Sequence, residues 1–211
     1  ISVIHNKHNM GVGYSYRTGI KLSKKEYYTL VSGEGEIYAS SLRDILSHAG
    51  KADMLISYVH NPEIRLLYRR ILSKGFTKLV NLLFGFNIKY YNGCVVHKTA
   101  LLKNVKMTTN NFAYQVETLV RLLKKGHSYK EIPYLVEETE GTELFRITNL
   151  IKFFLTVTNL FIDINIRKKV EVVLTEIGKK ISRENLNLNL IENLTPEILI
   201  KGSWKNKKFR R

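Results

Sequence analysis

Short apolar segments alternate with amphipathic helical segments in the first part of the chain, and this order constrains the fold more than any other feature. Short runs of aromatic and β-branched residues predict strands at residues 1–4, 27–31 and 54–57. Apolar residues at helical spacing predict helices near residues 14–23 and 40–48. Strands that are separated by helices pair in parallel, with helices on both faces of the sheet. The sequence therefore predicts an α/β fold with a mostly parallel sheet flanked by helices.

The strand predicted at residues 27–31 is followed by a turn that carries Glu34 and Glu36. At the carboxyl end of a parallel strand, this spacing places both carboxylates at the mouth of the sheet, where α/β proteins bind ligands. Carboxylate oxygens suit Mg²⁺ or Mn²⁺ that carries a diphosphate. Taken alone, the pair fits a solvated acidic turn better, because such short motifs need a supporting context.

The context of this turn resembles glycosyltransferase family 2, whose domain has the GT-A fold, over about the first 150 residues. The matching pieces are, in chain order, Asn9, Gly11 and Gly13; Arg17-Thr18-Gly19-Ile20; Ala52-Asp53-Met54-Leu55-Ile56-Ser57; Arg70 and Ser73; Tyr90-Tyr91-Asn92-Gly93; Phe112-Ala113-Tyr114-Gln115-Val116-Glu117; Lys125-Gly126; and Glu131-Ile132-Pro133. Each piece is short, but their order and spacing are similar to the branch that includes dolichyl- and polyprenyl-phosphate sugar transferases.

This resemblance implies transfer of a sugar from a nucleotide-sugar donor to a polyprenyl phosphate or another membrane-associated acceptor. It implies that the donor is bound by Asn9, Gly11, Gly13 and Glu34. Mg²⁺ or Mn²⁺ would be held by Glu34 and Glu36, where the family pattern usually has two Asp residues. Glutamate also ligates these metals, although its extra methylene displaces the carboxylate.

The resemblance also assigns residues to the acceptor and its phosphate, namely Arg65, Arg69, Arg70, Asn92 and Gly93. The family often places two basic residues after the strand that contains Pro133, and residues 138–143 lack them. Phosphate neutralisation is therefore expected from the three arginines.

Glu117 matches the acidic residue that the family places near the acceptor, and we predict that it is the catalytic residue. With a hydroxyl acceptor it would act as the general base. With a polyprenyl phosphate the nucleophile is already anionic, and Glu117 would orient neighbouring groups. Glu117 lies on a helix predicted at residues 112–125, which Gly126 ends, so it also fits an ion-paired structural group.

The formal charge of +16 is distributed unevenly. Residues 61–130 contain thirteen Lys and Arg against only Glu63 and Glu117, so this region attracts polyanions. Nucleic acid ranks below a membrane or a phosphate, because Tyr90 and Tyr91 are the only aromatic candidates for stacking with arginine.

A helix predicted to start at Pro62 combines this charge with an apolar stripe. The stripe consists of Ile64, Leu67, Tyr68, Ile71, Leu72, Phe76, Leu79, Val80, Leu83 and Phe84. Such a basic amphipathic helix either lies on an anionic membrane surface or packs its stripe into the core with a solvated basic face.

The ends of the chain complete the prediction. Residues 1–4 lack the pattern of a secretory signal and resemble the middle of a fold, so we expect an N-terminally truncated GT-A domain over residues 1–142. A helical, basic C-terminal extension is expected over residues 143–211. The apolar segment 144–166 is interrupted by charges and suggests an interfacial or a packing helix.

The lone Cys94 excludes an internal disulfide and fits a reducing cytoplasm. We therefore expect a cytoplasmic protein, peripheral on the inner face of the membrane. The alternative is a catalytically silent GT-A remnant that acts as a basic module for membrane-surface or partner binding.

Overall fold

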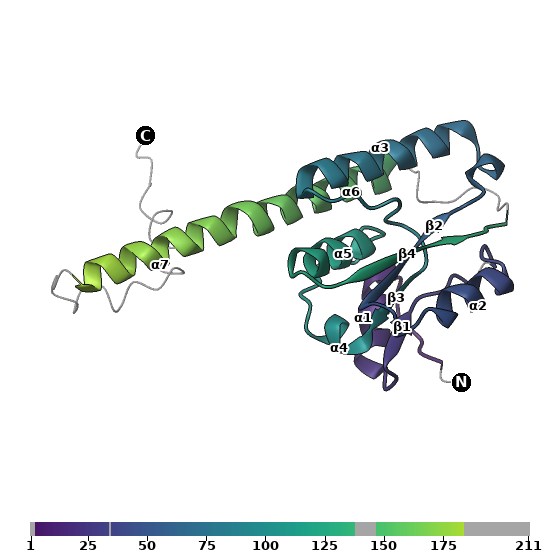
Figure 1. The fold of residues 1–211 in the computed structure, drawn as a ribbon, viewed down its shortest axis with the longest axis horizontal. Helices are drawn as coiled ribbons and strands as arrows, with labels where there is room; N and C mark the ends of the chain where they lie inside the picture. Colours follow the sequence, from purple (N-terminus) through teal and green to yellow (C-terminus); the bar gives the residue numbers. More distant parts are fainter. Residues whose placement is uncertain (1–2, 34, 138–146, 184–211) are drawn as a thin grey trace. The chain divides into compact units, whose positions relative to one another are not determined.

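The computed structural model in Figure 1 describes residues 3–33, 35–137 and 147–183. The chain divides into two compact units, Ile1–Phe161 and Ile162–Arg211. The first unit contains a four-stranded sheet with helices on both faces, and the described part of the second unit is helical. The expected boundary at residues 142 and 143 lies outside the described residues.

The sheet of the first unit has the strand order β1-β3-β2-β4. Its strands are β1 (Tyr27–Thr29), β2 (Met54–Val59), β3 (Val95–Lys98) and β4 (Tyr129–Tyr134). β2 pairs with β4 in parallel, whereas β3 is antiparallel to both β1 and β2. β1, β2 and β4 thus run in one direction and β3 in the other, so the sheet is mixed. The prediction of parallel pairing was wrong at β3, a strand that the sequence analysis did not identify.

Three predicted helices are present within one or two residues of their expected bounds: α1 (Val12–Leu22), α2 (Ala39–Ser47) and α5 (Tyr114–Lys124). A further short helix, α4 (Thr99–Lys103), follows β3 directly. The strand predicted at residues 1–4 is not found in its described half, because Val3 and Ile4 are exposed and belong to no strand.

The core occupies both faces of β2. Leu55 packs with Ile45 of α2 and Val96 of β3 on one face. On the opposite face, Met54 lies beside its register partner His97, whose Nδ1 is 3.3 Å from the hydroxyl oxygen of Tyr16 on α1. α2 therefore covers one face of the sheet and α1 the other (Figure 1).

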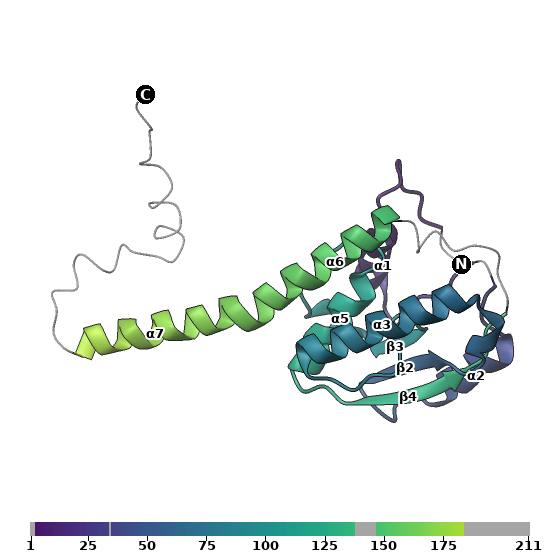
Figure 2. The same cartoon turned by 90° about the horizontal axis from the view of Figure 1, so that it is seen from above.

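α3 (Leu67–Phe84) and α6 (Ile147–Phe161) lie side by side in the first unit (Figures 1 and 2). Edge-to-face ring pairs between Phe76 and Phe153 and between Phe84 and Phe161 hold them together. A 3₁₀ turn, η1 (Pro62–Ile64), precedes α3, so the helix predicted to start at Pro62 starts five residues later.

The apolar stripe predicted on α3 is divided between core and surface. Val80 and Phe84 are buried, as a core-facing stripe requires. Leu67 and Ile71, however, are 66 % and 61 % exposed. The expectation that this stripe faces the core therefore holds only for its C-terminal part.

The described part of the second unit consists of a π-helical turn, η3 (Ile162–Arg167), and α7 (Lys168–Arg183). Among the described residues of the whole chain, no helix has both the length and the apolar character needed to span a bilayer.

Candidate functional site

A cavity of about 570 Å³ lies at the carboxyl edge of the sheet. Val59 and Tyr134, which end the parallel strands β2 and β4, line it together with the first half of α3. This is the edge where open α/β sheets bind their ligands, and the volume is in the range of small-molecule sites.

Positive charge dominates the polar lining of this cavity. Five basic side chains line it against the single carboxylate of Glu36; they are Arg65, Arg69, Arg70, Lys74 and Lys89. Lys89 is partly occupied elsewhere, because its Nζ lies 4.2 Å from the ring centre of Tyr58 and 3.9 Å from Glu131 Oε2. An anionic ligand is the chemistry that this excess of charge favours.

The three arginines come from the turn before α3 and from its first residues. Arg65 donates a hydrogen bond from Nη1 to the hydroxyl oxygen of Tyr90 at 3.1 Å. Arg69 is buried, and the buried Nε of Arg70 has no hydrogen-bond partner among the described residues. Buried donors in native proteins almost always have partners, so this Nε is a donor available to a bound anion.

The other part of the lining is apolar. It consists of Phe76 and Leu79 of α3 and of Leu150, Phe153 and the exposed Phe154 of α6. Phe76 lies six residues after Arg70, which is about 9 Å along a helix. The cavity therefore has both cationic and apolar lining residues, and Phe76 lies about two turns from Arg70 along α3.

The predicted metal site is described only in part, because Glu34 lies outside the described residues. Glu36 is half-buried and lines the cavity. Burial lowers the pKa of the Arg65 guanidinium, but its neighbours Tyr90, Tyr134 and Glu36 raise the pKa by more. The carboxylate of Glu36 therefore lies within electrostatic reach of Arg65. Among the described residues, no group of three or more His, Cys, Asp or Glu side chains could hold a metal ion. One carboxylate at this cavity still fits Mg²⁺ or Mn²⁺, because these ions are commonly held by one or two carboxylates and substrate phosphates.

The predicted donor residues Asn9, Gly11 and Gly13 do not line the cavity. Gly11 has a φ of +83°, and a Cβ there would come within 2.4 Å of the backbone oxygen of Asn110. A Cβ on Gly13 would come equally close to the oxygen of Thr109. These glycines therefore allow the start of α1 to pack against the loop at residues 108–110, and Asn9 accepts a hydrogen bond from the Gly11 N–H at 3.0 Å.

Glu117 holds the same loop from the other side. Its carboxylate accepts hydrogen bonds from the backbone N–H groups of Thr108 and Thr109 and from the Thr108 hydroxyl. Arg121 donates to it as well, with Nη2 at 3.1 Å from Oε1. Glu117 is 1 % exposed, so it is a fully paired, buried carboxylate rather than one that faces the cavity. Its predicted catalytic role stays a prediction.

The two predicted acceptor residues after Tyr91 have different surroundings. Asn92 lines the cavity. Gly93 is buried against β2, where a Cβ would lie 2.1 Å from the backbone oxygen of Ser57. Its carbonyl accepts a hydrogen bond from Gln115 Nε2 at 2.6 Å, so Gly93 positions the segment that carries Asn92.

The structure thus separates the predicted site residues into two groups. The cavity gathers Glu36, Arg65, Arg69, Arg70 and Asn92. The loop cluster, which we define as Gly11, Gly13, the loop at residues 108–110, Glu117 and Arg121, gathers the predicted residues Gly11, Gly13 and Glu117. Gly93 packs against β2 instead, and Glu34 lies outside the described residues. The sequence analysis did not identify Tyr134, Phe112 or the α6 residues as lining. The α6 residues reach the cavity because α6 packs against α3, and Tyr134 reaches it because β4 ends at the same edge of the sheet as β2.

Comparison with solved structures shows that the fold is GT-A-like. The chain is similar to three structures of glucosyl-3-phosphoglycerate synthase from Mycobacterium tuberculosis: in complex with UDP (TM-score 0.52, 9 % identity), with Mg²⁺ and UDP (0.51, 8 %) and with Mn²⁺ and UDP-glucose (0.51, 8 %). The matches cover 77 % of this chain and 55–56 % of those chains, so the chain spans slightly more than half of their length. No protein-family model and no curated protein matches the sequence.

Proposed function

We propose that this chain transfers a sugar from a nucleotide-sugar donor to a polyprenyl phosphate or another membrane-associated acceptor. The observation that carries the proposal is the cavity at the carboxyl edge of a GT-A-like sheet, which is lined by three arginines and by apolar side chains from α3 and α6. An acceptor with a phosphate head and a long apolar chain offers the same combination of charge and apolar surface.

The arginines would bind and orient the acceptor phosphate. Guanidinium groups suit this task because their N–H donors match the geometry of phosphate oxygens. An oxygen of the acceptor phosphate then attacks the anomeric carbon of the donor. The bond from that carbon to the diphosphate oxygen breaks, and the nucleoside diphosphate leaves with the bonding electrons.

A divalent metal, when bound, would neutralise charge on the diphosphate leaving group. Glu36 and Glu34 are the residues of this chain that would hold it. The attacking phosphate oxygen is already anionic near neutral pH, so this reaction needs no general base. The hydrogen bonds of Glu117 agree with that, because its carboxylate already binds Thr108, Thr109 and Arg121.

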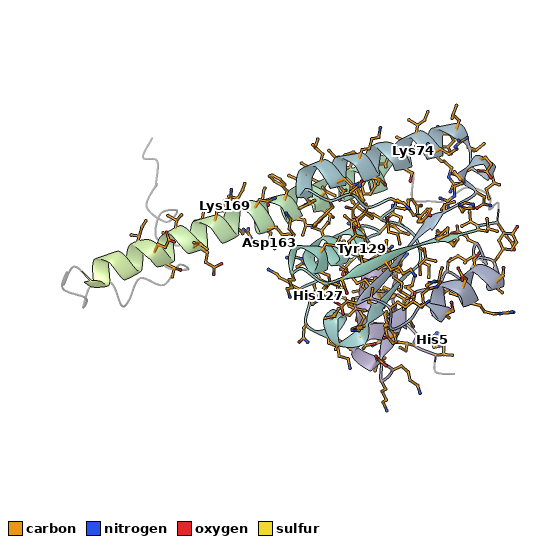
Figure 3. The ribbon with its side chains drawn as sticks, in the orientation of Figure 1. His5, Lys74, His127, Tyr129, Asp163 and Lys169 are labelled. Atoms are coloured by element: carbon orange, nitrogen blue, oxygen red, sulfur yellow. The ribbon has the colours of Figure 1, made fainter. Side chains whose placement is uncertain are left out.

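The outer face of α3 supports a position on a membrane surface. Leu67, Tyr68, Ile71 and Leu72 are exposed there, and Ile71 and Leu72 also line the cavity. Lys74 lies on the same helix (Figure 3). A helix with exposed apolar residues and cationic neighbours binds anionic bilayers, and an acceptor chain could pass from the bilayer to the cavity without crossing water.

A transfer assay tests this proposal. The protein is mixed with phosphatidylcholine–phosphatidylglycerol vesicles that contain undecaprenyl phosphate, Mn²⁺ and one radiolabelled UDP- or GDP-sugar at a time, and lipid-extracted label is counted. We expect transfer from at least one donor. We expect Arg70→Gln to reduce it by about tenfold or more, because hydrogen bonds to charged groups contribute about 1.5–3 kcal/mol.

The matched control is Arg43→Gln, which removes an equal charge from the exposed surface of α2 and should leave transfer unchanged. Equal losses in the two variants would show that Arg70 contributes only to net charge. Absence of transfer from every donor, with vesicle binding retained, would contradict the enzyme and favour the silent remnant. One observation favours that alternative: Asn9, Gly11 and Gly13 take part in packing at the loop cluster.

A further inference from the structure

We propose that α7 of the second unit is a separate membrane contact, which lies flat on an anionic bilayer with Val170, Val173, Leu174 and Ile177 toward the acyl chains. This inference concerns a different unit from the cavity and does not rest on the proposed sugar transfer.

The apolar residues of α7 form one stripe. Val170, Val173, Leu174 and Ile177 have the i, i+3, i+4, i+7 spacing of one helical face, and all four are 44–51 % exposed. The other side carries polar residues, including Glu171, Thr175 and Glu176, and only one apolar side chain among the same eight positions, Val172. Figure 2 shows α7 as an unbroken helix.

This stripe needs a partner if α7 is to be stable. Its valines and Gly178 lower the helix propensity, and a helix of 16 residues is marginal alone in water. Such a helix gains its stability by burying an apolar face. Within the described part of the second unit, η3 is the only other element, and it precedes α7 directly in the chain, so it leaves the stripe exposed.

Charge identifies an anionic bilayer as this partner. α7 contains five cationic residues against Glu171 and Glu176, and the cations are concentrated in its first and last turns; they are Lys168, Lys169, Lys179, Lys180 and Arg183. Arg167 precedes it, and Lys169 is exposed on the helix (Figure 3). Anionic lipid head groups attract such residues while the apolar stripe enters the acyl boundary.

A second copy of the chain fits this face less well. The exposed stripe spans eight residues, whereas coiled coils need apolar spacing sustained over at least three or four heptads. Two copies of α7 would also bring together helices of the same net positive charge.

Position-specific fluorescence on the full chain tests the proposal. In a Cys94→Ala background, Val170→Cys and the matched control Val172→Cys are each labelled with bimane. Vesicles contain phosphatidylcholine and phosphatidylglycerol with brominated acyl chains, which quench fluorophores that enter the membrane. We expect quenching at position 170 to be at least twice that at position 172, and to be lost without phosphatidylglycerol or in high salt.

Three results would overturn the proposal. Equal quenching at positions 170 and 172 would mean that α7 has no defined membrane face. No quenching at position 170 on anionic vesicles would mean that α7 stays in water. A blue-shifted emission at position 170 without vesicles would mean that protein covers the stripe. If this blue shift increased with protein concentration and light scattering gave a doubled mass, the covering protein would be a second copy of the chain. If the blue shift did not depend on protein concentration, another part of the same chain would cover the stripe.

A pair of variants gives a second measurement. Val170→Ser with Ile177→Ser removes two residues of the stripe, whereas Val172→Ser with Thr175→Ser changes the opposite face of the same helix. The quenching of a bimane at position 174 is followed in lipid titrations, which give the apparent partition coefficient of α7. We expect the first pair to lower this coefficient by about tenfold, because each buried apolar side chain adds to partitioning. The second pair should have little effect, and an equal reduction by both pairs would contradict the proposal.

Discussion

The loop cluster and the cavity differ in how their charged groups are satisfied. In the loop cluster, the carboxylate of Glu117 accepts hydrogen bonds from Thr108, Thr109 and Arg121 and is buried. The lining of the cavity has five basic side chains and one carboxylate, Glu36, and the Nε of Arg70 has no described hydrogen-bond partner. A charge that the protein itself pairs stabilises the fold, whereas an excess of charge around a cavity is ready for a ligand. This comparison assigns different roles to two glutamates that the sequence placed in one site.

Replacing Glu117 should have the largest effect on stability. Glu117→Gln leaves Arg121 without its ion pair and turns an amide group toward backbone donors, so we expect a loss of about 3–5 kcal/mol in the free energy of unfolding. Urea unfolding followed by circular dichroism measures it. Glu63→Gln, which removes an exposed carboxylate, is the control and should change stability by less than about 0.5 kcal/mol.

The same variant tests the catalytic prediction for Glu117. If Glu117→Gln folds with unchanged stability while turnover falls by the roughly hundredfold to ten-thousandfold typical of general-base loss, the acceptor is a hydroxyl. If stability falls and the folded fraction retains turnover, Glu117 is structural and the acceptor needs no base.

Acid should reveal a second buried group, His97, which lies in the core and has no charged partner among the described residues to stabilise an imidazolium. Burial lowers its pKa to about 3, from an ordinary value near 6.5. The unfolded chain therefore binds a proton between these values that the folded chain does not, so stability falls as the pH drops below about 6.5. The slope for one proton approaches about 1.4 kcal/mol per pH unit.

Unfolding free energies at pH 7, 6, 5 and 4 would check this slope. In His97→Gln the dependence should flatten in this range, even if the variant is less stable at pH 7. A control variant of a buried residue that does not titrate, Thr99→Ser, should keep the slope of the parent protein. Identical slopes in all three proteins would contradict the assignment to His97.

Replacing Glu36 should have the smallest effect on stability and a distinct effect on binding. Glu36→Gln should change the unfolding free energy by less than about 0.5 kcal/mol, because the side chain is only half-buried at the edge of a cavity. Loss of a group that holds the metal should weaken Mn²⁺-dependent binding of UDP by at least about tenfold. Isothermal titration calorimetry with Mn²⁺ and with EDTA measures this difference. Affinity equal to that of the Glu63→Gln control would contradict a metal at Glu36.

Several features of the fold could be predicted from the sequence because they depend on local spacing. Apolar residues at helical spacing predicted α1, α2 and α5. Short β-branched runs predicted β1 and β2. β3 was not predicted, because it has only four residues, and their alternation is too short to separate from the preceding loop. The resemblance to a GT-A transferase, made from scattered short motifs, agrees with the fold found by comparison.

The candidate site was predictable only in its charges. The surplus of basic residues around the start of α3 is a property of the sequence, and Arg65, Arg69 and Arg70 line the cavity. Tertiary structure alone decided that Phe153 of α6 completes this cavity, that Glu117 binds Thr108 and Thr109, and that Leu67 and Ile71 of α3 are exposed. The physical reason is that sequence spacing fixes which residues share one face of a helix or strand, whereas the packing of those faces determines which charges meet each other and which are left to meet a ligand.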